Sequence, residues 1–201
     1  LLIMRGDLHE ASSLIDELAG MADDAGDAQN AVFANLLRGV LNLHLDRLDL
    51  AHTQLHAGME GAASVPDRQS LCQAHGYQAL CALFAHDMPT AAQAVARGVA
   101  LLEEKRIAPH NAEALHYARA WLAIEQYEQL RGDDRKAALR RARRAVRDLR
   151  GLARIYRGAL PLAQCAAGTL YWIDRDLPRA IACWTDAEAA AKALHSGLLT
   201  G

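Results

Sequence analysis

The residue types best suited to chemistry in this chain of 201 residues are nine histidines and four cysteines. In the stretch HTQLH, His52 and His56 stand four residues apart, which puts two imidazole rings on one helix face, as in many zinc sites. In CQAH, Cys72 and His75 form a second pair. A zinc site needs at least one further ligand and neighbours that orient the ligands, and the sequence places neither. We therefore predict no metal and no other cofactor, and interpret these histidines as surface or helix-packing residues.

The sequence holds no motif of a known catalytic mechanism: it has no Gly-rich phosphate loop, no HExxH and no GxSxG. The four cysteines form no CxxC pair, so we interpret them as reduced thiols of a cytoplasmic protein. No apolar run approaches the roughly 18 residues that a membrane span needs. We predict that the chain is not an enzyme and has no membrane contact.

Positive charge is concentrated in DDRKAALRRARRAVRDLRGLARIYR, residues 133–157. This segment holds ten basic and three acidic residues, whereas residues 1–60 hold three basic and ten acidic ones, and the whole chain has a net charge of −2. Its apolar residues Ala138, Ala142, Ala145, Leu149 and Leu152 follow helical spacing, so the arginines lie to the sides or opposite. The predicted docking face consists of Arg140, Arg143, Arg144 and Arg147.

Three interpretations of this basic helix stay open: a docking face for an acidic partner protein or domain, a solvated helix surface, and a nucleic-acid contact. The nucleic-acid contact is the least favoured, because the chain is not basic overall and only Tyr156 is an aromatic neighbour of the arginines. Self-association is a further hypothesis, since the acidic N-terminal residues complement the basic helix of a second copy.

The elements that position these residues follow from a repeat. Five segments each consist of a turn-like stretch that leads to an alanine: RGDLHEA at 5–11, DRLDLAH at 46–52, HDMPTAA at 86–92, GDDRKAA at 132–138 and DRDLPRA at 174–180. The alanines are Ala11, Ala51, Ala91, Ala137 and Ala180, which predicts repeats of roughly forty residues. In the fourth repeat a register one residue later is an alternative, with Ala138, Ala142 and Ala145 on the inner face.

Between the turns the apolar residues recur with a helical period, and no strand pattern is present. Asp67 and Asn111, which follow prolines at short distance, indicate helix starts, and Pro161 indicates a kink or a helix start. We predict an all-α fold, with helix pairs near 7–46, 48–86, 89–131 and 133–174 and a closing helix over 177–195.

Alignment of the repeats on their alanine shows a small residue twelve positions before it in three of four repeats and a bulky apolar residue four positions after it in four of five. The fourth repeat departs from the pattern, with Glu125 and Arg141 at these positions. Gly39 and Gly168 are examples of the small residue, and Leu55 and Trp184 are examples of the bulky one. Two helices approach closely only where side chains are small. The pattern therefore predicts antiparallel helix pairs with a fixed crossing point.

This pattern resembles the tetratricopeptide repeat (TPR), most closely in the last unit, where Gly168, Tyr171, Ala180, Trp184 and Ala187 stand at the family's Gly, Tyr, Ala, aromatic and Ala positions. The long repeats are similar to the C-terminal helical regions of bacterial LuxR-type and maltose-regulon-activator-like regulators and related nucleotide-dependent signalling proteins. The resemblance implies one right-handed superhelix over residues 1–201, as a fragment of a larger multidomain protein. HEAT and armadillo repeats match the period about as well and stay the structural alternative.

The resemblance also implies a protein–protein interaction or scaffold module of a bacterial signalling or transcription-regulatory protein, with a partner protein or another domain of the same protein bound to it. The alternatives are an effector-sensing domain, with a small molecule or peptide in the concave groove, and an accessory domain of an enzyme. In the family the first helices of the pairs line that groove, although their polar residues can equally be ordinary solvent-facing positions. The candidates for groove binding are Asn35, Arg38, Asn42, Arg119, Gln126 and Gln129.

Overall fold

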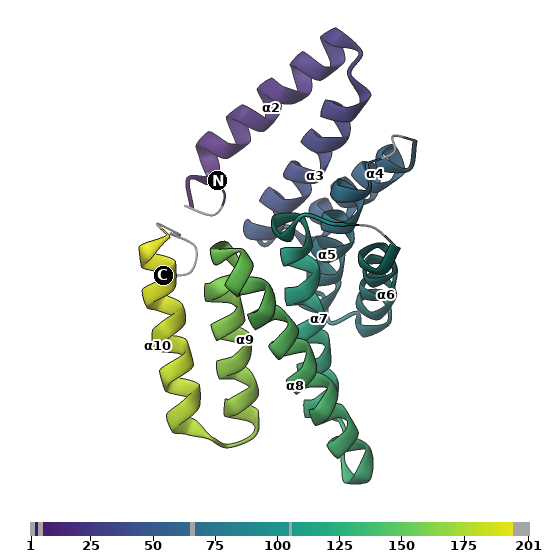
Figure 1. Ribbon diagram of the computed structural model, residues 1–201. Helices are drawn as coiled ribbons and strands as arrows, with labels where there is room; N and C mark the ends of the chain where they lie inside the picture. The colour runs from purple at the N-terminus through teal and green to yellow at the C-terminus, as the bar shows by residue number, and fades with distance from the viewer. Residues whose placement is uncertain (1–2, 4–5, 65–66, 105, 195–201) are drawn as a thin grey trace. The chain divides into compact units, whose positions relative to one another are not determined.

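The computed structural model describes residues 3, 6–64, 67–104 and 106–194 (Figure 1). Throughout these residues the regular structure is helical and contains no strand, and neighbouring helices pack in chain order, so the predicted all-α repeat fold is confirmed. The chain divides into two compact units, Leu1–Leu115 and His116–Gly201. Within the described residues, none of the helices is both long and apolar enough to cross a lipid bilayer.

The first unit is a series of consecutively packed helices. Asp67 begins one of them: its carboxylate accepts hydrogen bonds from the backbone N–H groups of Gln69 and Ser70, at 3.0 and 3.1 Å, as an N-cap does. The helix start predicted at Asp67 is thus confirmed. The helices are α2 (Leu8–Ala25), α3 (Ala28–His44), α4 (Leu48–Ser64), α5 (Arg68–Phe84), α6 (Met88–Glu104) and the first part of α7 (Pro109–Gln129).

The second unit holds the rest of α7, then α8 (Gly132–Ile155), a short 3-10 turn (Arg157–Ala159), α9 (Leu160–Ile173) and α10 (Leu177–Ala193). Pro161 is in the first turn of α9, where its missing N–H has no helical partner to lose. The predicted helix start at Pro161 is confirmed. The predicted pair boundaries agree with the observed helices to within a few residues.

The turns before Ala51, Ala91 and Ala180 share one hydrogen-bonded backbone conformation. The residue five positions before each repeat alanine has a positive φ, and in three turns the next N–H donates to the carbonyl oxygen five residues earlier, from Arg47, Asp87 and Asp176. In these three turns the left-handed residue follows the end of α3, α5 or α9 and satisfies its last carbonyl groups, whereas Gly132 is the first residue of α8. The positive-φ residues are Gly6 (84°), Asp46 (56°), His86 (58°), Gly132 (66°) and Arg175 (65°).

The repeat alanines are buried at Ala11, Ala51, Ala91 and Ala180. In the fourth repeat Ala137 is only half-buried, while Ala138 is 1% exposed, and Ala142 and Ala145 are also buried. The assignment of Ala137 is therefore wrong by one residue and the alternative register is confirmed. Because arginines stand on both sides of these alanines, the sequence does not show which alanine faces the core.

The helix pairs cross where the sequence places glycine. A β-carbon on Gly39 would lie 2.6 Å from Leu55 Cγ, and one on Gly168 would lie 2.5 Å from Trp184 Cδ1. Both distances are far below van der Waals contact, so α3 and α4, and likewise α9 and α10, approach each other only because these positions carry no side chain. The predicted crossing points are confirmed.

Candidate functional site

A groove in the second unit, with a volume of about 620 Å³, runs along α8 beside α9. Four arginines of α8 line it, and we call it the arginine groove: Arg143, Arg147, Arg150 and Arg154. The buried core residues Val146, Ala167 and Leu170 lie at its base, and the half-buried Tyr171 is the apolar side chain that it exposes.

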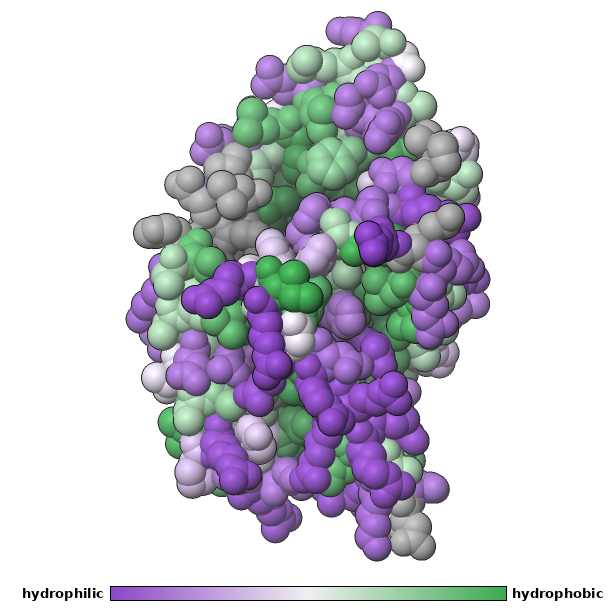
Figure 2. All heavy atoms as spheres, viewed as in Figure 1, coloured by the Kyte–Doolittle hydropathy of each residue, from purple (hydrophilic) through white to green (hydrophobic). Residues whose placement is uncertain are grey.

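The helical period of α8 explains why these four arginines share one side. They stand at positions i, i+4, i+7 and i+11, while Ala142, Ala145 and Leu149 form the buried stripe of the same helix. This alanine-rich stripe packs in the core of the second unit. The arginine row next to it on the helix therefore lies at the edge of the core, along the groove. Figure 2 shows hydrophilic side chains gathered along α8.

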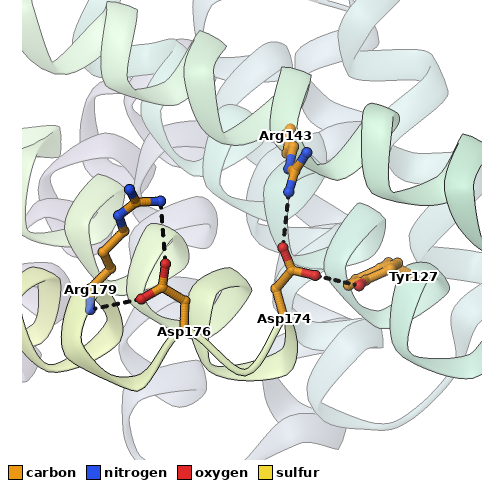
Figure 3. A network of polar contacts seen from close by, with 5 residues as sticks. All are labelled: Tyr127, Arg143, Asp174, Asp176 and Arg179. Atoms are coloured by element: carbon orange, nitrogen blue, oxygen red, sulfur yellow. Dashed lines mark hydrogen bonds and ion pairs between the residues drawn. The ribbon is translucent and has the colours of Figure 1, made fainter.

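Asp174, at the C-terminal end of α9, anchors one end of the groove (Figure 3). Its Oδ2 accepts a hydrogen bond from Arg143 Nη2 at 2.9 Å, and its Oδ1 accepts one from the Tyr127 hydroxyl at 3.0 Å. Burial, together with the bond to Asp174, raises the pKa of Tyr127, so the phenol stays protonated and donates. The network thus links α7, α8 and α9 at this point and neutralises Arg143.

Asp176 shapes the turn between α9 and α10 (Figure 3). Its carboxylate accepts from the backbone N–H of Arg179 at 3.3 Å as the N-cap of α10, and it pairs with the Arg179 guanidinium at 3.2 Å. Arg179 also lies over the Tyr171 ring, at 5.8 Å from its centroid. These contacts fix the α9–α10 turn next to the groove.

Arg150 is held by neutral acceptors. This half-buried guanidinium donates from Nη2 to Gln164 Oε1 at 2.9 Å and to Cys183 Sγ at 3.4 Å. Gln164 donates in turn to Asp186 at 3.3 Å. The charge of Arg150 is therefore positioned by α9 and α10 and is not cancelled by direct contact with a carboxylate in the described residues.

Arg147 and Arg154 are exposed, and no carboxylate in the described part of the chain forms an ion pair with either of them. Asp148, the acidic neighbour on α8, is already paired with Arg119 at 3.2 Å. Residues 116–201 as a whole carry fifteen basic and nine acidic side chains, whereas residues 1–115 carry seven and fifteen. The groove therefore presents uncompensated positive charge in a unit that is itself basic.

The predicted docking residues divide into two groups. Arg143 and Arg147 line the groove, whereas Arg140 and Arg144 are exposed on α8 and lie outside it. Sequence reasoning missed Arg150 and Arg154 as groove residues. Their spacing of seven from Arg143 and Arg147 was visible in the sequence. The sequence did not show, however, that α9 packs beside this row and lines the other side of the groove.

The predicted groove-binding residues fall in both units. Asn35, Arg38 and Asn42 lie on α3 of the first unit, and Arg119 and Gln126 lie on the part of α7 in the second unit. The two arginines already have partners: Arg38 donates to Asp16 at 2.8 Å, and Arg119 pairs with Asp148. The side chains of Asn35, Asn42 and Gln126 are half-buried and Gln129 is exposed.

A second cavity of about 720 Å³ borders Asp174 and carries mixed charge. Its Arg131 donates to the carbonyl oxygens of Glu128 and Leu130, and its Arg135 lies over the Tyr127 ring at 4.4 Å. Its lining holds three arginines, the exposed Arg175 among them, against Glu128 and Asp174, whereas the arginine groove holds four arginines against Asp174. This cavity is therefore the weaker candidate for an anionic ligand.

No set of three metal-ligating side chains comes together among the residues that the structure describes. The His52 and His56 rings lie 6.3 Å apart, and His56 is 3.6 Å from Glu60. Burial raises the pKa of the Cys72 thiol to about 11, so this cysteine is protonated at neutral pH and a poor nucleophile.

Comparison of the chain with protein-family models and with curated protein sequences finds no match. What the arginine groove binds is therefore inferred from its own geometry and charge.

Proposed function

We propose that this chain is a protein-interaction module whose arginine groove binds an acidic segment of a partner protein. The observation that carries the proposal is the groove itself, in which Arg147 and Arg154 face solvent without a carboxylate partner among the described residues, beside the half-buried Tyr171. Arginine suits this role because its planar guanidinium donates two parallel hydrogen bonds to a carboxylate.

The chemistry of the groove favours a polypeptide over a nucleic acid. An acidic amphipathic segment can lay an apolar side chain against the half-buried Tyr171 ring while its carboxylates pair with the arginines on both sides. A single-stranded nucleic acid needs exposed rings for base stacking, but Tyr171, the aromatic residue in this groove, is half-buried and lies next to Arg179.

The setting that we propose is a signalling or transcription-regulatory protein of the bacterial type, in which this module recruits a partner and carries out no reaction. The TPR-like pattern of the repeats supports this setting. Arrays of packed helix pairs offer long surfaces for protein binding, and their packing holds a row such as the four arginines in place without ligand.

Fluorescence anisotropy with two labelled helical peptides tests the proposal. The peptides have the same length and the same apolar residues, and one carries glutamate where the other carries lysine. We expect the acidic peptide to bind and the basic one to show no saturable binding. The double substitution Arg147→Glu and Arg154→Glu should weaken binding of the acidic peptide by at least about tenfold, since it removes two close charge pairs.

A matched control changes the same net charge on the same helix. Arg140→Glu with Arg144→Glu alters two exposed arginines outside the groove, and the acidic peptide should keep its affinity to within about threefold. An equal loss in both double variants would mean that the peptide responds to net charge alone, and the groove would then not be the binding site.

A further inference from the structure

The exposed face of α2 carries an acidic and apolar stripe that the charge balance alone does not reveal. Its members recur at i, i+4, i+7, i+11 and i+14 and so share one face of the helix. We call it the α2 stripe: Glu10, Leu14, Glu17, Met21 and Asp24.

The α2 stripe is unoccupied by any described part of the chain. Leu14 is 50% exposed and Met21 is 63% exposed. Glu10, Glu17 and Asp24 are exposed and form no ion pair with a described residue, whereas Asp16 on another side of α2 is paired with Arg38. Single exposed apolar residues are common, but here two of them alternate with three free carboxylates along one line.

The α2 stripe matches the arginine groove in chemistry and in spacing. Its carboxylates follow each other every seven residues, or about 10.5 Å along the helix axis. In the groove, Arg147 and Arg154, which have no carboxylate partner among the described residues, are also seven residues apart. Leu14 and Met21 lie between the carboxylates, where the half-buried Tyr171 ring of the groove offers them an apolar contact.

We propose that the occupant of the arginine groove is α2 of a second copy of this chain. The inference rests on the proposed function, since it names the acidic segment that the groove binds. The balance of charge supports it: residues 1–115 have a net charge of −8 and residues 116–201 one of +6, so unlike halves of two copies attract. Each copy offers one stripe and one groove, so two copies form a closed dimer by exchange, and a non-closing arrangement forms longer chains.

Sedimentation velocity at two salt concentrations gives the first test. At about 50 mM salt we expect the wild-type chain to reach at least twice its mass of 21.8 kDa as its concentration rises, and at about 500 mM salt to return towards the monomer. A chain that stays monomeric at low salt and high concentration overturns the inference.

A charge swap gives the decisive test. The stripe variant carries Glu10→Arg, Glu17→Arg and Asp24→Arg, and the groove variant carries Arg147→Glu and Arg154→Glu. Each variant alone should be monomeric, because like charges then face each other. A mixture of the two should associate again, because each stripe meets a groove of opposite charge. Association of either variant alone, or no association in the mixture, overturns the inference.

The exposed positions of all five substitutions leave the core intact, and circular dichroism of each variant checks that it is folded. The control variant with Arg140→Glu and Arg144→Glu should associate like the wild type. If the acidic peptide binds to the groove while the chain is monomeric, this inference falls and the proposed function stands. If neither the peptide nor a second copy binds to the groove, both fall.

Discussion

Gly76 offers the sharpest test of how the repeats pack. A β-carbon on Gly76 of α5 would lie 2.4 Å from the backbone nitrogen of Leu115 and 2.7 Å from the carbonyl carbon of Ala114, both on α7. Backbone atoms cannot rotate out of the way, so in Gly76→Ala the two helices must separate. We expect this substitution to destabilise the folded protein although alanine favours the helix.

The size of the effect follows from two opposing terms. Overpacking costs about 1–3 kcal/mol or more, while replacement of a helical glycine by alanine gains about 1 kcal/mol. For Gly76→Ala, whose contacts are backbone atoms, we expect a net loss of about 1–2 kcal/mol. Gly20→Ala on α2 meets nothing within 4 Å and should gain about 0.5–1 kcal/mol. Gly39→Ala should fall between them, since its contact is the Leu55 side chain, which can shift.

Urea unfolding followed by circular dichroism measures this order. The free energy of unfolding should rank Gly20→Ala first, then wild type, Gly39→Ala and Gly76→Ala. If Gly76→Ala were as stable as the wild type or more stable, the close approach of α5 and α7 would be refuted. If Gly20→Ala were as damaging as Gly76→Ala, the effect would not come from the contact.

Three further predictions concern single side chains. Burial raises the pKa of Glu113 to about 7, from an ordinary value of 4.5, so its proton is held more tightly in the folded state, and stability should fall as the pH rises from 4.5 through 7. Glu113→Gln should remove this pH dependence. Relative to the wild type, the variant should therefore be more stable at pH 8 than at pH 4 by at most about 3 kcal/mol. Urea unfolding of the variant with unchanged pH dependence would contradict this prediction. His86→Gly, at a φ of 58°, should raise the melting temperature by relieving about 1 kcal/mol of left-handed strain, and a lower melting temperature would count against the repeat turn. Tyr127→Phe leaves the exposed Asp174 without its hydroxyl donor and should cost about 1 kcal/mol in urea unfolding, whereas a stabilised variant would show that the bond does not contribute.

Much of the fold follows from local chemistry and was predicted from the sequence. Asp67 and Pro161 begin helices because a side-chain acceptor and a missing N–H suit the first turn. Gly39 and Gly168 mark crossings because only glycine leaves room for the facing bulky side chain. The register of the fourth repeat stayed open in the sequence, since Ala137 and Ala138 are both small and only packing decides between them.

The site was predicted less completely. The wheel of α8 separated alanines from arginines, but it could not choose among the arginines, because the choice of Arg147 over Arg144 depends on the side of α8 on which α9 packs. Net charge likewise concealed the α2 stripe. Asp16 and Glu17 count equally in a sum of charges, yet Asp16 is paired with Arg38 while Glu17 is exposed without an ion-pair partner among the described residues.

A heteronuclear NMR titration that follows the arginine Nε–Hε signals shows directly whether the arginine groove is the binding site. On addition of the acidic peptide we expect the signals of Arg147 and Arg154 to shift and saturate together, while those of Arg140 and Arg144 move little. Equal shifts of all four signals, or none at Arg147 and Arg154, would show that the peptide does not bind in the groove.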